Sequence, residues 1–402
     1  MSTADRVGVI GAGIVGLAVA RRLGELGVAS ELTVLDKEDH VGAHQTGHNS
    51  GVAHAGVYYT PGSLKAKLCR RGVELLKPYC EERRIAYDEC GKLIVARNQD
   101  ELGRLDEIER RASANGVPGL KRLDPAQMVG IEPYVRGVSA LHSPHTAIVD
   151  FKAVTRAFAD DVCARGGTVR LGFEVAGIDR SGGELCVRSR SGEALVFDRL
   201  VVCGGLYSDR LAEMSGEGRE PWIVPFRGEY YKLVPARTEM VRGLIYPVPD
   251  PAYPFLGVHF TRRVDGGVDI GPNAVLAFKR EGYRRTDFSA TDLLDVLRSQ
   301  GFRRLARKHW RMGAAEMWGS VSKRAFIARA RDFIPALSIA DVEPAPAGVR
   351  AQALDPDGSL VDDFRITRAG GLVLVRNAPS PAATSSLAIA EYIADQLQEA
   401  RC

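Results

Sequence analysis

The first 36 residues alternate between the spacing of a buried strand and that of an amphipathic helix. The segment RVGVI, which starts at Arg6, is a short apolar run followed by glycine, a pattern typical of a buried parallel strand. Residues 14–26 then have helical spacing, which places Val15 and Val19 on one face. The segment ELTVLD, residues 31–36, predicts a second strand. Together these elements predict a βαβ unit with two parallel strands and a right-handed crossover.

Helical and strand patterns continue to alternate along the rest of the chain. The run LVVCGG, from Leu200, again ends in glycines and predicts a return to the first sheet. Further helices are predicted at residues 62–84, 100–115, 124–133, 150–167 and 291–318, and a last helix closes the chain after a small-residue turn. Strands are predicted at residues 90–97 and 371–377 and in the strand-rich stretches 168–203 and 222–270.

Because the two kinds of pattern interleave, we predict two domains that are each built from several segments. The fold class is α/β, or α+β overall, with a Rossmann-like nucleotide-binding domain and a mixed-sheet substrate domain. The nucleotide-binding domain takes residues 1–85, 150–215 and 341–402, and the substrate domain takes residues 86–149 and 216–340.

Composition narrows the class of protein. Of the 402 residues, 45% are hydrophobic and 26% are charged, as in ordinary soluble globular proteins. A net charge of +4 is too small to indicate nucleic-acid binding. No apolar run approaches the roughly 18 residues of a transmembrane helix, and MSTADR is too short and polar for a signal peptide. We therefore expect a cytoplasmic protein without a transmembrane segment.

The cysteines do not suggest a metal centre or a disulfide framework. No CxxC pair occurs, and the number of cysteines is odd. We predict reduced thiols and no bound metal. The seven cysteines are Cys69, Cys80, Cys90, Cys163, Cys186, Cys203 and Cys402.

The turn after the first strand carries a dinucleotide-binding fingerprint. In GAGIVG, Gly11 permits the tight turn, Gly13 lets the backbone approach a pyrophosphate, and Gly16 lets helix and strand pack closely. Asp36 ends the second strand, where an acidic side chain holds the adenosine ribose. A glycine-rich structural turn is the alternative interpretation. The position of the fingerprint at the N-terminus, with later segments returning to the same sheet, favours FAD over NAD.

Seven blocks elsewhere in the chain resemble one family of flavoproteins. They are TGHNSGVAHAGVYYTPGSLKAKLCRRG, CGKLIVA, PHTAIVDFKAV, FRGEYYKL, YPVPDPAYPFLGVHFTRRVDGGVDIGPNAVLAFKREGY, GVRAQALDPDGSLVDDF and NAPSPAATSSLAIAEYI. In order and extent they resemble the L-2-hydroxyglutarate dehydrogenase/oxidase family, which belongs to the superfamily of D-amino-acid, glycine and sarcosine oxidases. The arginine-rich segment 286–330 matches only loosely, so a related substrate is an alternative.

The resemblance implies a function and a set of cofactor contacts. It implies non-covalent FAD, oxidation of L-2-hydroxyglutarate to 2-oxoglutarate, and a membrane electron acceptor in many members. Small residues after Thr46 would let the backbone press against the flavin or the pyrophosphate. The residues expected to bind FAD are Gly11, Gly13, Ile14, Val15, Gly16, Asp36, Lys37, His48, Asn49, Ser50, Gly51, Val52, Val175, Cys203, Gly204, Arg350, Ala383, Thr384 and Ser385.

Oxidation of a 2-hydroxy acid also needs a base and a site for two carboxylates. Histidine suits the removal of the hydroxyl proton, and the candidates are His54 and His259, each of which has a purely structural role as its alternative. Arg350 is the first candidate for a carboxylate, because guanidinium groups bind carboxylates in bidentate geometry. Weaker candidates for substrate binding are Tyr59, Lys65, Tyr230 and Arg262.

The C-terminal turn NAPSPAATSS would complete the site. Ala383, Thr384 and Ser385 lie at the expected start of the last helix, where backbone N–H groups stabilise negative charge on a reduced flavin. An ordinary helix N-cap is the alternative.

Other functions stay open at this stage. An amine or amino-acid oxidase of the same fold, or an oxidase of a related hydroxy acid, is the nearest alternative. A redox-silent FAD-binding scaffold and an NAD-linked dehydrogenase are more distant ones. The expected electron acceptor is oxygen or a quinone, and a partner flavoprotein stays open as a third. We expect a small dicarboxylate as the substrate and no nucleic-acid partner. Peripheral membrane contact needs an exposed apolar or basic patch, and the sequence alone shows none.

Overall fold

The computed structural model describes residues 5–250 and 257–398. Its helices begin with α1, whose first turn follows Gly13 directly, and end with α10 near the C-terminus. In chain order the helices are α1 (Ile14–Leu26), α2 (Leu64–Glu82), α3 (Leu102–Ala114), α4 (Pro125–Ile131), α5 (Phe151–Ala164), α6 (Ser208–Met214), α7 (Ala290–Arg298), α8 (Gln300–Val321), α9 (Lys323–Arg331) and α10 (Ser386–Gln398).

The strands form two large sheets and two small ones. In chain order the strands are β1 (Asp5–Ile10), β2 (Ala29–Leu35), β3 (Val52–Ala53), β4 (Tyr87–Asp88), β5 (Lys92–Ala96), β6 (Lys121–Leu123), β7 (Ser139–Ser143), β8 (Ala147–Val149), β9 (Thr168–Arg170), β10 (Val175–Ser181), β11 (Glu184–Ser189), β12 (Ala194–Phe197), β13 (Arg199–Val202), β14 (Trp222–Leu233), β15 (Leu244–Pro247), β16 (His259–Arg262), β17 (Val268–Gly271), β18 (Val275–Leu276), β19 (Val342–Leu354), β20 (Arg365–Ala369) and β21 (Leu372–Asn377).

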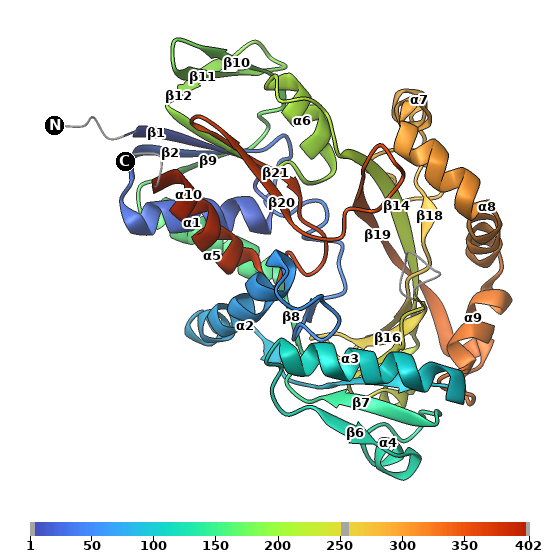
Figure 1. Ribbon diagram of the computed structural model, residues 1–402. Helices are drawn as coiled ribbons and strands as arrows, with labels where there is room; N and C mark the ends of the chain where they lie inside the picture. Colours follow the sequence, from blue (N-terminus) through green and yellow to red (C-terminus); the bar gives the residue numbers. More distant parts are fainter. Residues whose placement is uncertain (1–4, 251–256, 399–402) are drawn as a thin grey trace.

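A six-stranded sheet, with the order β20-β21-β13-β1-β2-β9, holds the N-terminal fingerprint. Strands β9, β2, β1, β13 and β21 are mutually parallel, and only β20 runs antiparallel. The predicted βαβ unit is confirmed, and so is the return of the chain to the same sheet at β13. This sheet lies at the left of Figure 1, with α1, α5 and α10 beneath it and β10–β12 above it.

Both faces of this sheet are buried, which explains its nearly continuous apolar strands. Val9 and Val201 face α1, α5 and α10 in one core cluster. Ile10 and Val202, one residue further along, face the β10–β12 sheet in a second cluster. The alternation follows from the strand period of two, which sends successive side chains to opposite faces.

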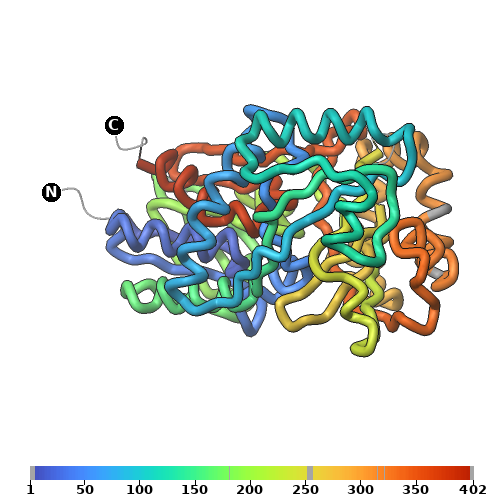
Figure 2. The backbone as a smooth tube through the Cα atoms, turned by 90° about the horizontal axis from the view of Figure 1, so that it is seen from below, coloured from blue at the N-terminus to red at the C-terminus, as the bar shows by residue number. Residues whose placement is uncertain are grey.

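A nine-stranded sheet forms the other half of the molecule. Its order is β18-β14-β17-β16-β15-β5-β7-β6, and β19 pairs with the other side of β14. Strands β14 and β19 form a long antiparallel pair, in which Phe226 lies opposite Arg350. Helices α7, α8 and α9 lie on the outer side of β14 and β18, and Figure 2 shows this segment, in orange, at the opposite end from the N- and C-terminal segments.

Most predicted helices and strands are confirmed with small shifts at their ends. Helix α5, for example, runs from Phe151 to Ala164 and is capped by the Asp150 side chain. The helical stretch predicted at residues 291–318 is divided between α7 and α8, and α6 and α9 were not predicted. The proposed division into domains stays a prediction. Two of its cofactor-domain segments, 1–85 and 150–215, supply four of the strands in the six-stranded sheet, and the third segment supplies β20 and β21. Residues 342–354 of that third segment form β19, which pairs in the nine-stranded sheet.

The cysteines were expected to be reduced thiols. The six cysteines of the described residues are free, and Cys402 lies outside the described residues. Part of the block YPVPDPAYPFLG, residues 251–256, also lies outside them. Among the described helices, none has the length and apolar character needed to cross a membrane.

Candidate active site

A large cavity lies between the two main sheets. Its volume is about 1440 Å³, which exceeds the roughly 300–1,000 Å³ of a typical small-molecule site. The six-stranded sheet contributes Gly11 and Asp36 to the wall, and the nine-stranded sheet contributes Tyr230, His259 and Arg350. The cavity is therefore large enough to hold a nucleotide beside one sheet and a second, chemically different group beside the other.

The glycine turn is packed as the fingerprint predicts. Gly11 has a φ of +108°, and a Cβ atom there would lie 2.4 Å from the carbonyl oxygen of Cys203. A Cβ atom on Gly16 would lie 1.9 Å from the carbonyl oxygen of Gly11. The turn and α1 therefore require glycine at both positions, because any larger residue would collide with backbone.

The start of α1 offers free donors to the cavity. No side chain caps the helix at Gly13, and Ile14 donates its N–H to Thr46 Oγ1 at 3.1 Å. Among the described residues, nothing accepts a hydrogen bond from the N–H groups of Gly13 and Val15. A helix N-terminus with free N–H groups is a favourable place for a pyrophosphate.

Asp36 stands at the expected end of the second strand. Its Oδ2 accepts a hydrogen bond from the Ala12 N–H at 2.6 Å, and its Oδ1 accepts one from the Glu38 N–H at 2.9 Å. Lys37, beside it, makes ion pairs with Glu38 and Glu281. Asp36 thus ties the glycine turn to the second strand while its carboxylate lines the cavity.

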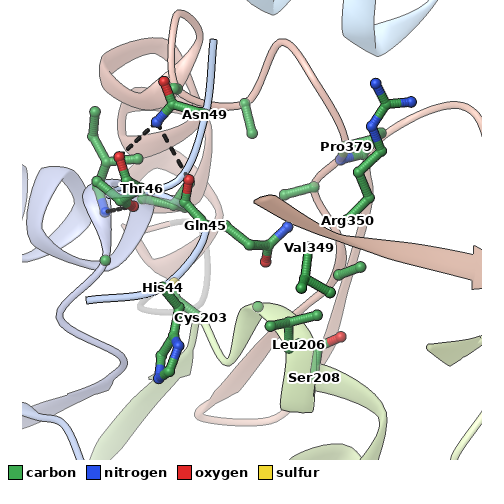
Figure 3. A pocket seen from close by; sticks show the side chains of 18 of the residues that line it. His44, Gln45, Thr46, Asn49, Cys203, Leu206, Ser208, Val349, Arg350 and Pro379 are labelled. Atoms are coloured by element: carbon green, nitrogen blue, oxygen red, sulfur yellow. Dashed lines mark hydrogen bonds between the residues drawn. The ribbon is translucent and has the colours of Figure 1, made fainter. Parts of the chain in front are cut away.

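The loop after β2 is held by its own side chains. Asn49 Nδ2 donates to the carbonyl oxygens of Gln45 and Thr46, and Asn49 Oδ1 accepts the Gly51 N–H at 2.8 Å. Figure 3 shows the two bonds from Asn49 to Gln45 and Thr46 on one side of the view and Arg350 on the other. The Asn49 amide therefore shapes the loop, and its predicted contact with the cofactor stays a prediction.

Most of the predicted cofactor and substrate residues line this one cavity. Three predicted residues, Gly51, Arg262 and Ser385, are absent from the described lining. Arg262 donates to the Arg242 carbonyl oxygen, and its guanidinium lies 3.6 Å from the Asp88 carboxylate. The predicted residues in the lining are Gly11, Gly13, Ile14, Val15, Gly16, Asp36, Lys37, His48, Asn49, Ser50, Val52, His54, Tyr59, Lys65, Val175, Cys203, Gly204, Tyr230, His259, Arg350, Ala383 and Thr384.

His259, at the start of β16, has a defined protonation pattern. Its Nδ1 lies 2.9 Å from the Gly257 carbonyl oxygen, which only accepts, so Nδ1 carries the proton and Nε2 keeps a lone pair. The ring stacks on Tyr246 at 4.0 Å and is 4% exposed. Burial lowers the pKa of His259 to about 3, and the charges of Arg350 and Lys92 act in the same direction. The imidazole is therefore neutral at physiological pH.

His54, after β3, lies in the same region of the cavity. Its Nε2 is 3.3 Å from Ser380 Oγ, and its backbone N–H donates to Thr384 Oγ1 at 3.1 Å. Burial lowers the pKa of His54 well below its ordinary value, with further contributions from Lys92 and His259. Both candidate bases are thus neutral.

Lys92 is a functional candidate that the sequence analysis missed. It lies in β5, is 1% exposed, and pairs with no carboxylate among the described residues. Its Nζ lies 4.3 Å from the centre of the Tyr246 ring and 5.5 Å from that of Tyr58, and both tyrosines line the cavity. Burial lowers the pKa of Lys92 to about 7. A buried cation beside two neutral histidines favours an anionic ligand.

Lys65, which was predicted as a weaker candidate for substrate binding, already pairs with a carboxylate. Its Nζ donates to Asp362 Oδ1 at 2.8 Å and to the Asp362 carbonyl oxygen at 3.0 Å.

Tyr58, which was also not predicted from the sequence, has a buried hydroxyl without a partner among the described residues. The only sequence feature that could have pointed to Tyr58 is the pair of adjacent tyrosines in the block GVYYTPG.

The C-terminal turn supplies two of the three predicted donors. The Ser385 N–H donates to the Pro381 carbonyl oxygen at 3.0 Å and so is not available to a ligand. Among the described residues, nothing accepts from the N–H groups of Ala383 and Thr384, which both line the cavity. Thr384 Oγ1 also lies 3.3 Å from the Val52 carbonyl oxygen, which holds this turn against β3.

These features fit a bound dinucleotide. Free N–H groups face the cavity at Gly13 and Val15 at one point and at Ala383 and Thr384 at another. Glycines leave room for the backbone to approach a ligand, and Asp36 stands where a ribose is held.

Solved flavoenzymes share this architecture over its full length. An FAD-bound L-α-glycerophosphate oxidase from Mycoplasma pneumoniae matches with a TM-score of 0.81, at 20% identity, over 98% of this chain and 94% of the other. A glycine oxidase from Geobacillus kaustophilus matches with a TM-score of 0.74, at 16% identity, over 98% and 95%. The family model described as FAD dependent oxidoreductase matches residues 6–396. Fold and site thus define an FAD-dependent oxidoreductase.

Similar sequences narrow this class. The mitochondrial L-2-hydroxyglutarate dehydrogenase of Homo sapiens is 47% identical over 97% of this chain and 88% of its own length. The L-2-hydroxyglutarate dehydrogenase of Escherichia coli is 44% identical over 97% of this chain and 92% of its own length. The chain belongs to the L-2-hydroxyglutarate dehydrogenase family of FAD-dependent oxidoreductases, as its sequence blocks predicted.

Proposed function

We propose that the chain oxidises L-2-hydroxyglutarate to 2-oxoglutarate, and that a histidine accepts the hydroxyl proton. The observation that carries the proposal is that His54, His259 and Arg350 line the same cavity as the glycine turn and Asp36. The substrate named for the 44–47% identical relatives supports the same choice.

We assign the cofactor contacts to three parts of the chain. The N–H groups of Gly13 and Val15 would hold the pyrophosphate, and the Asp36 carboxylate would hold the ribose. The N–H groups of Ala383 and Thr384 would stabilise negative charge on the reduced ring. FAD, when bound, supplies the acceptor for the hydride that leaves carbon 2 of the substrate.

The tautomer of His259 suits it to the role of base. Because Nδ1 donates to the Gly257 carbonyl oxygen, Nε2 is free to accept the hydroxyl proton as the carbonyl bond of the product forms. The electron pair of the C–H bond leaves as hydride, and the O–H proton stays on the imidazole, so charge and atoms balance. A bound carboxylate opposes the lowering of the pKa of His259 by burial, which makes the ring a stronger base in the complex.

The two carboxylates of the substrate require two cationic partners. Arg350 and Lys92 both act electrostatically on His259, so an anion held beside this histidine lies within reach of their fields. We assign Arg350 to the carboxylate next to the hydroxyl carbon, because a guanidinium can orient it in bidentate geometry. Lys92 compensates the second negative charge from behind Tyr246.

Replacement of each histidine by glutamine tests the proposed base. His259→Gln should slow anaerobic flavin reduction by roughly 10²–10⁴-fold, because an amide cannot take the proton. His54→Gln should have a smaller effect, since its Nε2 already contacts Ser380. Stopped-flow measurement of flavin absorbance at several pH values gives both rates.

A third variant serves as the control. His142→Gln changes a histidine on β7 that does not line the cavity, and it should reduce flavin at the wild-type rate. Wild-type rates in His259→Gln would remove this residue from the reaction. A loss confined to His54→Gln would transfer the role of base to His54.

A further inference from the structure

A short segment between β18 and α7 joins the two halves of the molecule at the cavity. Residues 280–283 follow a strand of the nine-stranded sheet, yet their long side chains contact the six-stranded half. They end one of the sequence blocks that resemble the family, and neither the cofactor contacts nor the proposed base gives them a role. We call residues 280–283 the clasp segment.

Arg280 fixes the clasp segment to α6. Its side chain is 1% exposed, and its Nη1 and Nη2 donate to the two carboxylate oxygens of Asp209 at 2.6 and 2.8 Å. Nη1 also donates to the Leu206 carbonyl oxygen at 2.5 Å. Helix α6 packs on the six-stranded sheet through Leu211 and Ala212. The bidentate pair therefore holds the clasp segment against the half that carries the glycine turn.

Glu281 belongs to an ion cluster on the cavity wall. Its Oε1 lies 2.5 Å from Lys37 Nζ and 3.0 Å from His44 Nε2, and both partners also pair with Glu38. All four side chains line the cavity together with Asp36. Burial opposes ionisation of Glu38, but hydrogen bonds from Lys37 and His44 outweigh it and lower the pKa of this carboxyl. The contact between the two halves is therefore a charged one.

Tyr283 adds a second contact with the same loop. Its ring stacks on that of His48, with centroids 4.1 Å apart and an angle of 25° between the planes. Its hydroxyl lies 3.1 Å from His44 Nδ1. Since ionised carboxylates only accept hydrogen bonds, His44 Nε2 carries the proton that points at Glu38 and Glu281. The His44 ring thus contacts both side chains of the clasp segment, one at each nitrogen.

We propose that the clasp segment retains FAD and separates from the loop after β2 before the cofactor leaves. That loop begins at Asp36, assigned above to the ribose, and continues to the small residues expected at the flavin. The clasp segment holds the loop at Lys37, His44 and His48, so the two halves part only when all three contacts break. Contacts of this kind slow dissociation more than they change association.

A divalent cation is the other ligand that the ion cluster suggests. One ligand atom each from Glu38, His44 and Glu281 lie within 4.8 Å of one another, a spacing that could hold a metal ion. However, Lys37 Nζ pairs with both carboxylates and already supplies the positive charge that such an ion would bring. The cluster therefore favours a role in holding the two halves together.

Retention of the cofactor goes beyond the oxidation itself and does not depend on the substrate. Release of FAD is measured without L-2-hydroxyglutarate, so a negative result would leave the proposed function untouched. A failure of L-2-hydroxyglutarate to reduce the flavin would, in turn, leave the clasp segment untested by that experiment and unaffected by it.

Rapid dilution of the FAD-loaded protein, followed by the recovery of free flavin fluorescence, tests the proposal. Glu281→Gln should accelerate FAD release about 10-fold, because it weakens two charged contacts at a partly buried site. Tyr283→Phe keeps the stacked ring and loses only the hydroxyl, so it should accelerate release by a smaller factor. Association of FAD with the apoprotein should proceed at the wild-type rate in both variants.

Glu89→Gln is a matched control. Glu89 also pairs with a lysine and a histidine, at 3.1 Å from Lys77 and 3.3 Å from His145, but it is not part of the described lining of the cavity. This variant should release FAD at the wild-type rate. Equal acceleration in the control would overturn the proposal, because any lost ion pair would then loosen the cofactor.

Three further results would overturn it. Release at the wild-type rate from both Glu281→Gln and Tyr283→Phe would show that the clasp segment does not retain FAD. Slower association with an unchanged release rate would show that the segment shapes the empty site instead. Faster release from the wild type in the presence of EDTA would assign the cluster to a metal ion, whereas we expect EDTA to have no effect.

Discussion

Lys92 and His259 show how burial sets the chemistry of single residues. Lys92 lies in the middle of the nine-stranded sheet, against the rings of Tyr246 and Tyr58, and Tyr246 in turn stacks on His259. Desolvation disfavours the charged form of each side chain, so the pKa of Lys92 falls to about 7 and that of His259 falls to about 3. A bound substrate anion would favour the charged form of both side chains and so raise both pKa values.

The lowered pKa of Lys92 predicts a pH-dependent stability. Between about pH 7 and pH 10 the unfolded chain binds one more proton at this residue than the native chain does, so stability attributable to Lys92 rises with pH. Lys92→Met should therefore be more stable than the wild type at pH 7, and the difference should shrink toward zero near pH 10, by up to about 1.4 kcal/mol per pH unit.

Urea unfolding of both proteins, loaded with FAD, at three pH values measures this difference. Lys121→Met, which changes an exposed lysine on β6, should give a difference that does not vary with pH. A Lys92→Met difference that stays constant would show that Lys92 has an ordinary pKa, and one that grows toward pH 10 would show a raised pKa; either result would contradict the prediction.

The sequence identified some site residues and missed others for a physical reason. Gly11, Gly16 and Asp36 could be predicted because local backbone geometry demands those residue types at fixed spacing. Lys92 could not, because a lysine in CGKLIVA looks like any solvated residue at a strand end. Its burial depends on β7 and β15, which lie on either side of β5 but far from it in the sequence.

At the scale of elements, the first turn of α1 is the most tightly determined part of the site. A Cβ atom at Gly16 would lie 1.9 Å from the Gly11 carbonyl oxygen, and the turn has no space in which to yield. This contact fixes the direction in which the start of α1 points and hence the position of the free N–H groups of Gly13 and Val15.

Gly16→Ala should therefore disrupt FAD binding. We expect the dissociation constant for FAD to rise at least about 10-fold, because relief of the clash costs roughly 1–3 kcal/mol and moves the pyrophosphate cradle. Fluorescence titration of the apoprotein with FAD measures it. The control is Gly103→Ala in α3, where a Cβ atom meets nothing within 4 Å and FAD affinity should not change. Equal affinities in wild type and Gly16→Ala would refute the role assigned to this turn.

Most elements were predictable, but strand partners were not. The helical spacing of residues 150–167 and the apolar runs of β1, β13 and β21 are local signals, and each gave the observed element. The pairing of β19 with β14 joins segments more than 100 residues apart, and nothing in a single sequence specifies it. For the same reason, the position of Arg350 opposite Phe226 was beyond sequence-based prediction.

At the scale of the molecule, function depends on the space between the two large sheets. The six-stranded sheet supplies the glycine turn and Asp36, whereas the nine-stranded sheet supplies His259, Arg350 and, behind Tyr246, Lys92. A Cβ atom on Gly348 of β19 would lie 2.5 Å from the His48 carbonyl oxygen, so the two halves are in close contact beside the cavity. Interleaving of the segments along the chain brings the two halves of the site together.

The identity of the substrate that reduces the flavin is the central test of the proposed function. The most direct measurement mixes the FAD-loaded protein anaerobically with L-2-hydroxyglutarate, D-2-hydroxyglutarate, L-malate or glycine and follows loss of the oxidised flavin spectrum. We predict rapid loss with L-2-hydroxyglutarate, and much slower loss or none with the other three. No reduction by L-2-hydroxyglutarate, or faster reduction by glycine or L-malate, would contradict the proposed function and leave an FAD-dependent oxidoreductase with a different substrate.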